Sequence, residues 1–203
     1  MSSTLYIEGG GGRQDLKDLK IACRKGFRLL LESMGYSGRM PKLISCGSRD
    51  TTFSDLRTAC KNRQDEYVAM IIDSEEAVSD PEKTWDHLKA RDGWDRPDKS
   101  CDEDVLFMTT CMETWITSDR EALKEYYSRY LQESSLPSLS GIEGRNRHKI
   151  QEMLKDATRN GSKPYSKGKA SFELVGKPNL DSLMEPLVSF RRMKRILDEK
   201  LSN

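Results

Sequence analysis

Short apolar runs and longer segments of helical periodicity alternate over the first third of the chain. The apolar runs cover residues 5–7, 42–46 and 67–72, and their length is typical of buried strands. Between them, apolar residues recur every three or four positions over about residues 15–34 and 52–63, which predicts two amphipathic helices. Strands that alternate with helices through short links form parallel sheets with right-handed crossovers. The pattern therefore predicts an α/β fold with a mostly parallel, Rossmann-like sheet flanked by helices.

Local signals suggest where several of these helices begin and end. Asp15 precedes the first helix, and residues 48–52 supply caps for the second. Residues 91–94 predict a turn, and Ser118-Asp-Arg-Glu121 has the spacing of a capping box.

The rest of the chain contains one more apolar run and is otherwise mostly helical in pattern. Residues 105–112 predict a fourth strand. Helices are predicted over about residues 85–88, 118–132, 147–160 and 180–201, the last interrupted at Pro186. We expect a core over residues 1–117 and a mostly helical C-terminal extension, residues 118–203, packed on it.

Composition and charge limit the classes of function. The 203 residues suit one domain with embellishments, and a net charge of +1 provides no overall field that would attract nucleic acid. Five cysteines, an odd number without a CxxC pair, predict free thiols in a reducing cytoplasm rather than a zinc site. No signal peptide is evident, and no segment approaches the roughly 18 apolar residues of a membrane span.

Carboxylates follow two of the predicted strands. Glu8 ends the first strand, while Asp73 and Glu75 end and follow the third. Parallel strands end at the same edge of a sheet, where α/β proteins bind their ligands. Carboxylates that meet there repel one another, a hard cation relieves the repulsion, and oxygen ligands favour Mg²⁺ or Mn²⁺. The alternative is that Glu8 and Glu75 are solvated strand ends.

A run of glycines comes directly after Glu8. The backbone amides of Gly9, Gly10 and Gly11 could hold a phosphate at the N-terminus of the following helix. A tight turn is the alternative interpretation, and the absence of Gly-Lys-Ser/Thr excludes a Walker loop.

Basic and aromatic residues offer further contacts. Between residues 145 and 169, eight basic residues stand against two acidic ones, which suits either a phosphate backbone or a solvated helix face. Trp85 and Trp94 could stack on bases, whereas we expect Trp115 to pack in the core. We expect His87 to be a surface or loop histidine rather than a proton shuttle.

Two motifs resemble those of Toprim domains. Residues 5–9, Leu-Tyr-Ile-Glu-Gly, resemble the first motif, an apolar strand that ends in Glu-Gly. Residues 71–75, Ile-Ile-Asp-Ser-Glu, resemble the second, Asp-x-Asp, here in the form Asp-x-Glu. Up to about residue 174, the chain is similar to a Toprim-like bacterial family of unknown function that is often encoded beside AAA or ABC-type ATPases. Further residues that carry this resemblance lie at 23–27, 87–94, 111–115, 165–168 and 171–174.

The resemblance implies phosphodiester chemistry on Mg²⁺ or Mn²⁺. It makes Glu8, Asp73 and Glu75 the metal-site carboxylates, with general acid–base catalysis as an alternative role for Glu8. Toprim nucleases of the overcoming-lysogenization-defect type add a Ser-x-Glu motif and a distal lysine. Cys111-Met-Glu113 resembles the former, with Cys in place of Ser, and Lys167 could be the latter, a fixed positive charge for the charge that develops on phosphorus.

Two departures from the family pattern keep a second hypothesis open. Glu75 replaces an aspartate, and Ala170 stands where the family has a histidine. The leading expectation is a metal-dependent nuclease of DNA or RNA that acts as the effector of an ATPase-linked phage-defence system. The alternative is an inactive Toprim-fold subunit that regulates an ATPase complex. The sequence leaves open the nucleic acid, the trigger, one metal or two, and whether the protein forms a homodimer.

Overall fold

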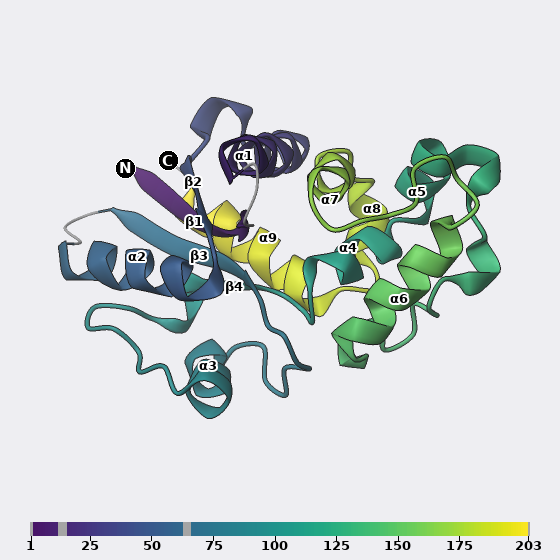
Figure 1. Ribbon diagram of the computed structural model, residues 1–203. Helices are drawn as coiled ribbons and strands as arrows, with labels where there is room; N and C mark the ends of the chain where they lie inside the picture. Colours follow the sequence, from purple (N-terminus) through teal and green to yellow (C-terminus); the bar gives the residue numbers. More distant parts are fainter. Residues whose placement is uncertain (1, 12–15, 63–65, 203) are drawn as a thin grey trace.

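Four strands form a parallel sheet in the order β2-β1-β3-β4 (Figure 1). The computed structural model describes residues 2–11, 16–62 and 66–202. The strands are β1 (Ser3–Gly10), β2 (Lys42–Gly47), β3 (Tyr67–Asp73) and β4 (Val105–Met108). Every neighbouring pair is parallel, so all four strands end at the same edge. The predicted α/β fold with a parallel sheet is confirmed.

The order of the strands reverses direction after β2. The chain steps from β1 to β2 on one side and then crosses back to β3 on the other. As a result, α1 (Leu16–Ser33) and α2 (Arg49–Asn62) pack on opposite faces of the sheet (Figure 1). Open α/β sheets bind ligands in the crevice at such a reversal. Here that crevice lies between the ends of β1 and β3.

The central strand β3 is buried on both faces. Its residues alternate, so Ala69 and Ile71 join the hydrophobic cluster that contains α1, while Met70 and Ile72 join the cluster that contains α2. Complete burial of an aliphatic side chain contributes about 1.5–3 kcal/mol to the free energy of unfolding. This apolar strand therefore anchors the sheet and fixes the position of Asp73 at its end.

The remaining helices follow β3 and β4. They are α3 (Thr84–Asp92), α4 (Met112–Ser118), α5 (Arg120–Tyr127), α6 (Arg147–Thr158), α7 (Lys169–Val175), α8 (Leu180–Met184) and α9 (Val188–Lys200). Short 3-10 turns occur at Ser37–Arg39, Asp102–Asp104, Ser128–Tyr130, Glu133–Ser135 and Ile142–Gly144.

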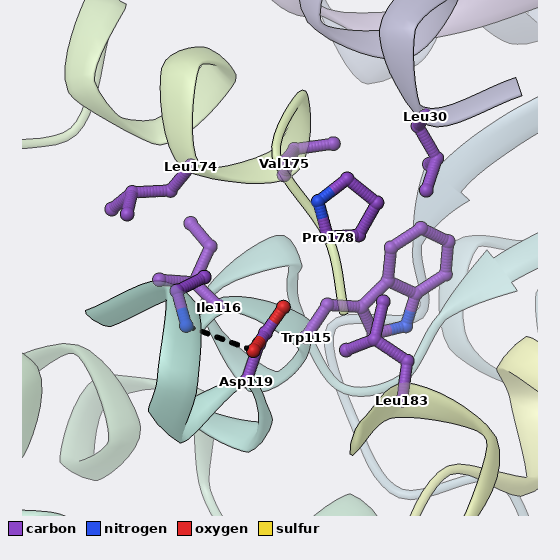
Figure 2. A pocket seen from close by; sticks show the side chains of 9 residues that line it. Leu30, Trp115, Ile116, Asp119, Leu174, Val175, Pro178 and Leu183 are labelled. Carbon is purple, nitrogen blue, oxygen red and sulfur yellow. Dashed lines mark hydrogen bonds between the residues drawn. The ribbon is translucent and has the colours of Figure 1, made fainter. Parts of the chain in front are cut away.

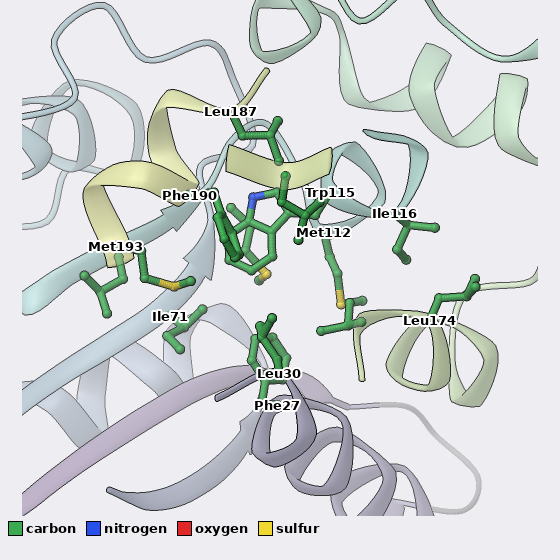
Figure 3. Packing of buried hydrophobic residues seen from close by; sticks show 14 of the residues in the cluster. Phe27, Leu30, Ile71, Met112, Trp115, Ile116, Leu174, Leu187, Phe190 and Met193 are labelled. Atoms are coloured by element: carbon green, nitrogen blue, oxygen red, sulfur yellow. The ribbon is translucent and has the colours of Figure 1, made fainter. Parts of the chain in front are cut away.

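The last helix, α9, returns to the sheet and packs on β4 (Figure 1). Its Phe190 meets Trp115 of α4 edge-on, with ring centroids 5.0 Å apart. Side chains from β3, α1, α4 and α9 meet in one cluster (Figure 3), which runs from Leu5 to Leu201. Trp115 is a core residue, as expected. The division of the chain at residue 117 stays a prediction.

The fourth strand is shorter than predicted. It ends at Met108 rather than at residue 112, because its neighbour β3 ends at Asp73, the partner of Met108. Residues beyond that point have no strand to pair with, and the chain turns into α4 at Met112.

The predicted helix boundaries near residues 91 and 118 also need correction. Ser118 is the last residue of α4, and it is the Asp119 carboxylate that caps α5, accepting the amide of Ala122 at 3.1 Å. This helix ends at Tyr127, well before the expected residue 132. Similarly, α3 continues to Asp92, two residues into the expected turn at 91–94, and Gly93, with a φ of 71°, ends it. The predicted cap Asp15 and the predicted end of the second helix at Arg63 lie outside the described residues.

Replacing Ile71 by Ala tests the role of β3. The side chain is fully buried between the helices and the sheet, so we expect a loss of about 2–5 kcal/mol in the free energy of unfolding, measured by urea denaturation. Ile21→Ala is the matched control, because Ile21 is 46% exposed on α1 and its removal should change stability by less than about 0.5 kcal/mol. Equal effects at the two positions would contradict this account.

Candidate metal centre

Three carboxylates meet at the point where the strand order reverses. Glu8 ends β1, Asp73 ends β3, and Glu75 lies two residues farther on; one oxygen atom from each lies within 4.8 Å of the others. Asp73 is 4% exposed, and the other two are partly buried. The structure therefore brings together the three residues that the sequence analysis selected, as an oxygen-only set of donors.

The end of β1 leaves the regular ladder to place Glu8. Glu8, Gly9 and Gly10 all face Gly47 of β2, so the register shifts at each step. The Glu8 carboxylate accepts the backbone amide of Asp73 at 3.2 Å, which ties the ends of the two strands together. Burial raises the pKa of Glu8, and the charge of Arg49 opposes this shift.

The glycines after Glu8 are required by close packing. Gly10 has a φ of 76°, and a Cβ atom there would lie 2.8 Å from the Ser45 hydroxyl and 2.9 Å from the Lys20 backbone. This favours the tight-turn interpretation for Gly10. Gly9, Gly10 and Gly11 nevertheless line the same pocket as Glu8 and Asp73. Residues 12–15 lie outside the described part, so a phosphate cradle at the start of α1 stays a prediction.

Asp73 is the most deeply buried carboxylate of the three. Its Oδ1 accepts the amide of Met112, the first residue of α4, at 2.8 Å. Burial and the neighbouring charge of Glu8 together raise the pKa of Asp73 to about 7, although the charge of Lys167 opposes the shift. A buried carboxyl beside a second one is a group that a cation would stabilise in its ionised form.

Glu75 is held in an unusual backbone conformation. Its φ is 70°, in the left-handed region that residues other than glycine rarely adopt. Its amide donates to the carbonyl of Thr110 at 2.7 Å, and its carboxylate pairs with Arg91 at 3.2 Å and with Arg147. Such conformations cost about 1–3 kcal/mol and concentrate at functional sites. Several contacts thus aim this carboxylate at the other two.

Arg49, which the sequence analysis did not select, lies beside the carboxylates. Arg49, the first residue of α2, places Nη1 3.6 Å from Glu8 Oε2 and donates to the carbonyl of Asp73. A two-point ion pair with Asp92, at 2.7 and 3.2 Å, holds its guanidinium in place. Arg49 follows β2 directly, so the rule that selected Glu8 and Asp73 could also have found it.

Lys167 reaches the same centre from the loop before α7. Its Nζ lies 3.7 Å from Asp73 Oδ2. Burial would lower the pKa of Lys167, but the charges of Glu113 and Asp73 outweigh this effect and raise it. The lysine is therefore charged at neutral pH.

Glu113 lies below this loop and is fully buried on α4. Its carboxylate accepts hydrogen bonds from the Tyr165 hydroxyl at 2.9 Å and from the side-chain amide of Gln151 at 3.2 Å, so protein groups occupy both of its oxygens. The Tyr165 hydroxyl also contacts Ser171 at 2.8 Å, and Ser171 accepts the amide of Gly168 at 3.1 Å. These contacts position the loop that carries Lys167, and the catalytic role expected for Glu113 stays a prediction.

Two of the carboxylates, Glu8 and Asp73, line a pocket of about 260 Å³, which Lys167 also lines. A second cavity (Figure 2) lies among apolar side chains of α4, α7 and α8 and has a volume of about 10 Å³. That is scarcely room for one water molecule. Its one charged residue, Asp119, is occupied as a helix cap. Of these two pockets, the first is therefore the one that suits a ligand.

The other candidates have different surroundings. His87, expected on the surface or in a loop, is a half-buried residue of α3 whose Nε2 contacts the carbonyl of Ser74 at 3.0 Å, so it supports the turn between Asp73 and Glu75. Trp85 is buried, and its indole N–H donates to the carbonyl of Cys101 at 2.9 Å. Trp94 is partly exposed and stacks on Phe53.

The protein thus belongs to the class of α/β proteins that carry an acidic cluster where the strand order reverses. The chain belongs to the family described as a domain of unknown function, DUF4276, whose model matches residues 19–198. No curated protein and no solved structure matches the chain. None of the described helices has the length and apolar character needed to cross a membrane.

The raised pKa of Asp73 predicts how stability depends on pH when a chelator removes divalent cations. The folded state keeps its proton up to about pH 7, whereas the unfolded carboxyl loses it near pH 3.8. The contribution of Asp73 to the free energy of unfolding is therefore fully present below pH 3.8. It decreases as pH rises to about 7, by up to about 1.4 kcal/mol per pH unit.

Asp73→Asn should flatten this part of the stability profile, measured by chemical denaturation between pH 4 and 8. The exposed Asp156→Asn should leave the profile unchanged. The assignment would be contradicted if the stability of the wild type rose between pH 4 and 8 while that of Asp73→Asn did not.

Proposed function

We propose that this protein is a Toprim-like, divalent-metal-dependent nuclease that hydrolyses phosphodiester bonds in DNA or RNA. The observation that carries the proposal is the convergence of Glu8, Asp73 and Glu75, with oxygens within 4.8 Å of one another, at the reversal of the strand order. Such a set of donors matches the preference of Mg²⁺ or Mn²⁺ for oxygen ligands.

The three carboxylates would hold the cation. When bound, a divalent cation of this kind neutralises phosphate charge and lowers the pKa of water. The pKa values of Asp73 and Glu8, both raised by burial, support a site that gains stability from added positive charge. Glu8 also remains a candidate for proton transfer, because it lines the pocket and is held by the Asp73 amide.

The cationic side chains would bind and orient the phosphodiester. Lys167 is charged, exposed and reaches the pocket, so it can contact a phosphate oxygen. Arg49 is fixed by Asp92 beside Glu8, which preorganises its guanidinium for the same anion. Arg91 and Arg147 hold the Glu75 carboxylate in place.

In this proposal the nuclease works with an AAA or ABC-type ATPase as the effector of a phage-defence pair in the cytoplasm. The resemblance to families encoded beside such ATPases supports the partner, and the five free cysteines suit a reducing compartment. A homodimer is compatible with the proposal.

A specific observation favours the alternative, a Toprim-fold regulatory subunit without turnover. Two guanidinium groups, from Arg91 and Arg147, already pair with Glu75, so a cation would have to compete for that carboxylate. Ala170, in place of the family's histidine, points the same way.

Nuclease assays separate the two functions. We expect Mn²⁺-dependent degradation of plasmid DNA, single-stranded DNA or transfer RNA, and at least a 100-fold loss of rate in Glu8→Ala. Glu76→Ala is the matched control, because Glu76 is exposed and close in sequence. Full activity in Glu8→Ala would remove this residue from the mechanism. The absence of cleavage with either metal, with and without the ATPase, would favour the regulatory subunit.

Metal binding can be measured without turnover. Mn²⁺ at 100 times its Kd should stabilise the wild type by about 2.7 kcal/mol, seen as an increase in Tm. Asp73→Asn should lose this increase, whereas Asp156→Asn should retain it. An equal increase in Tm for Asp73→Asn would place the cation elsewhere.

A further inference from the structure

The exposed side of α2 carries a regular series of cationic and aromatic residues. Arg49, Phe53, Arg57 and Lys61 recur at every fourth position. This spacing places them on one face of the helix, about 6 Å apart along its axis. We call these four residues, together with Trp94, the α2 track.

Trp94 comes from the turn after α3 and packs against the track. Its ring is stacked on that of Phe53, with centroids 4.2 Å apart and an interplanar angle of 5°. The guanidinium carbon of Arg49 lies 5.1 Å from the centroid of Trp94, and that of Arg57 lies 5.6 Å from the centroid of Phe53. Cations thus flank a pair of aromatic rings.

The track begins at the carboxylate centre. Arg49 contacts Glu8 on one side and Trp94 on the other, so a single side chain separates the acidic cluster from the aromatic pair. Arg57 and Lys61 lie farther along α2 and are exposed. In the part of the chain that the structure describes, neither forms an ion pair with a carboxylate.

An open pocket of about 430 Å³ lies beside the track. Phe53 and Trp94 form its aromatic part, and Arg57, Lys61 and Arg96 supply positive charge. Of its two acidic residues, Asp95 and Asp98, the first is bound by Lys89 at 2.7 Å. The volume is within the range of small-ligand pockets, which is about 300–1,000 Å³.

Core packing alone does not account for this arrangement. Trp85, nearby on α3, is 4% exposed and donates its indole N–H to a backbone carbonyl. Phe53 and Trp94 instead remain partly exposed at the mouth of a basic pocket. Aromatic rings beside arginine and lysine are the means by which proteins hold unpaired bases and their phosphates.

We infer that the α2 track and its pocket bind a single-stranded polynucleotide and lead it to the carboxylate centre. A base stacks on the outer face of Phe53, where it displaces the exposed guanidinium of Arg57, and phosphates contact Arg57, Lys61 and Arg96. The strand must be unpaired, because a base inside a duplex has both faces covered by its neighbours. The inference rests on the proposed function only in that the bound strand would be the substrate of that site.

Fluorescence anisotropy with labelled 12-mers in the presence of a chelator tests binding without cleavage. The probes are oligo-dT, oligo-rU and a 12-base-pair DNA duplex. We expect both single strands, or one of them, to bind more tightly than the duplex, and the difference between oligo-dT and oligo-rU identifies the preferred sugar. Failure to bind either single strand, or tighter binding of the duplex, overturns the inference.

Two sets of variants separate the phosphate contacts from the base contact. Arg57→Ala combined with Lys61→Ala should weaken binding at least 10-fold. It should also reduce the slope of log K against log salt concentration by about 1.4, because two phosphate contacts are lost. Trp94→Ala should weaken binding about 5- to 150-fold with little change in that slope. The reason is that Phe53 loses the ring that holds it in place for a stacked base, and stacking is worth about 1–3 kcal/mol per base.

Lys17→Ala combined with Arg24→Ala is the matched control. It removes the same charge from exposed positions of α1, on the opposite face of the sheet. Equal weakening by both double variants would reduce the effect to overall charge and overturn the inference. Trp94→Phe keeps an aromatic ring and should bind like the wild type while losing the quenching of indole fluorescence on binding; unchanged quenching in this variant would also overturn it.

The outcome for the nuclease proposal can be distinguished from this one. Glu8→Ala should retain binding to the α2 track even if cleavage is lost. Binding that depends on the α2 track, without any metal-dependent cleavage, would contradict only the nuclease proposal. Metal-dependent cleavage, together with binding that is unchanged by substitution of Trp94, Arg57 and Lys61, would contradict only the inference about the α2 track.

Discussion

The buried carboxylate of Asp73 is the group around which the site is built. It ends the central strand β3, accepts the first amide of α4, and lies beside Lys167 from the loop before α7. Its own backbone amide donates to Glu8 of β1. One residue therefore links the end of β1, the end of β3, the start of α4 and the C-terminal half of the chain. Removing the Glu8 carboxylate would leave the buried amide of Asp73 without this hydrogen bond, which costs about 1–3 kcal/mol.

Charge balance explains how three carboxylates can lie so close together. Arg49 faces Glu8, Lys167 faces Asp73, and Arg91 reaches Glu75. These cations reduce the repulsion that the carboxylates would otherwise exert on one another. The same groups would bind a phosphate, so an acidic cluster surrounded by fixed cations is compatible both with a metal centre and with anion recognition.

The C-terminal helices serve this centre through packing as well as through charge. Glu113 of α4 is buried beneath the loop of Lys167 and holds it through Tyr165 and Ser171. Trp115 and Phe190 join α4 to α9, which in turn packs on β4. The position of one exposed lysine thus depends on the same hydrophobic cluster that supports the sheet (Figure 3).

The sequence by itself determined the parallel sheet and the convergence of Glu8, Asp73 and Glu75. Both follow from local hydrophobic pattern and from the rule that parallel strands end at one edge. The end of β4 at Met108 was not predictable, because it depends on where β3 stops. Only the tertiary structure decided that Arg49, Arg91 and Arg147 face the carboxylates, that Glu113 supports a loop, and that Trp94 stacks on Phe53. These contacts join residues far apart in the chain, so they depend on how helices dock against the sheet, and no local pattern encodes that docking.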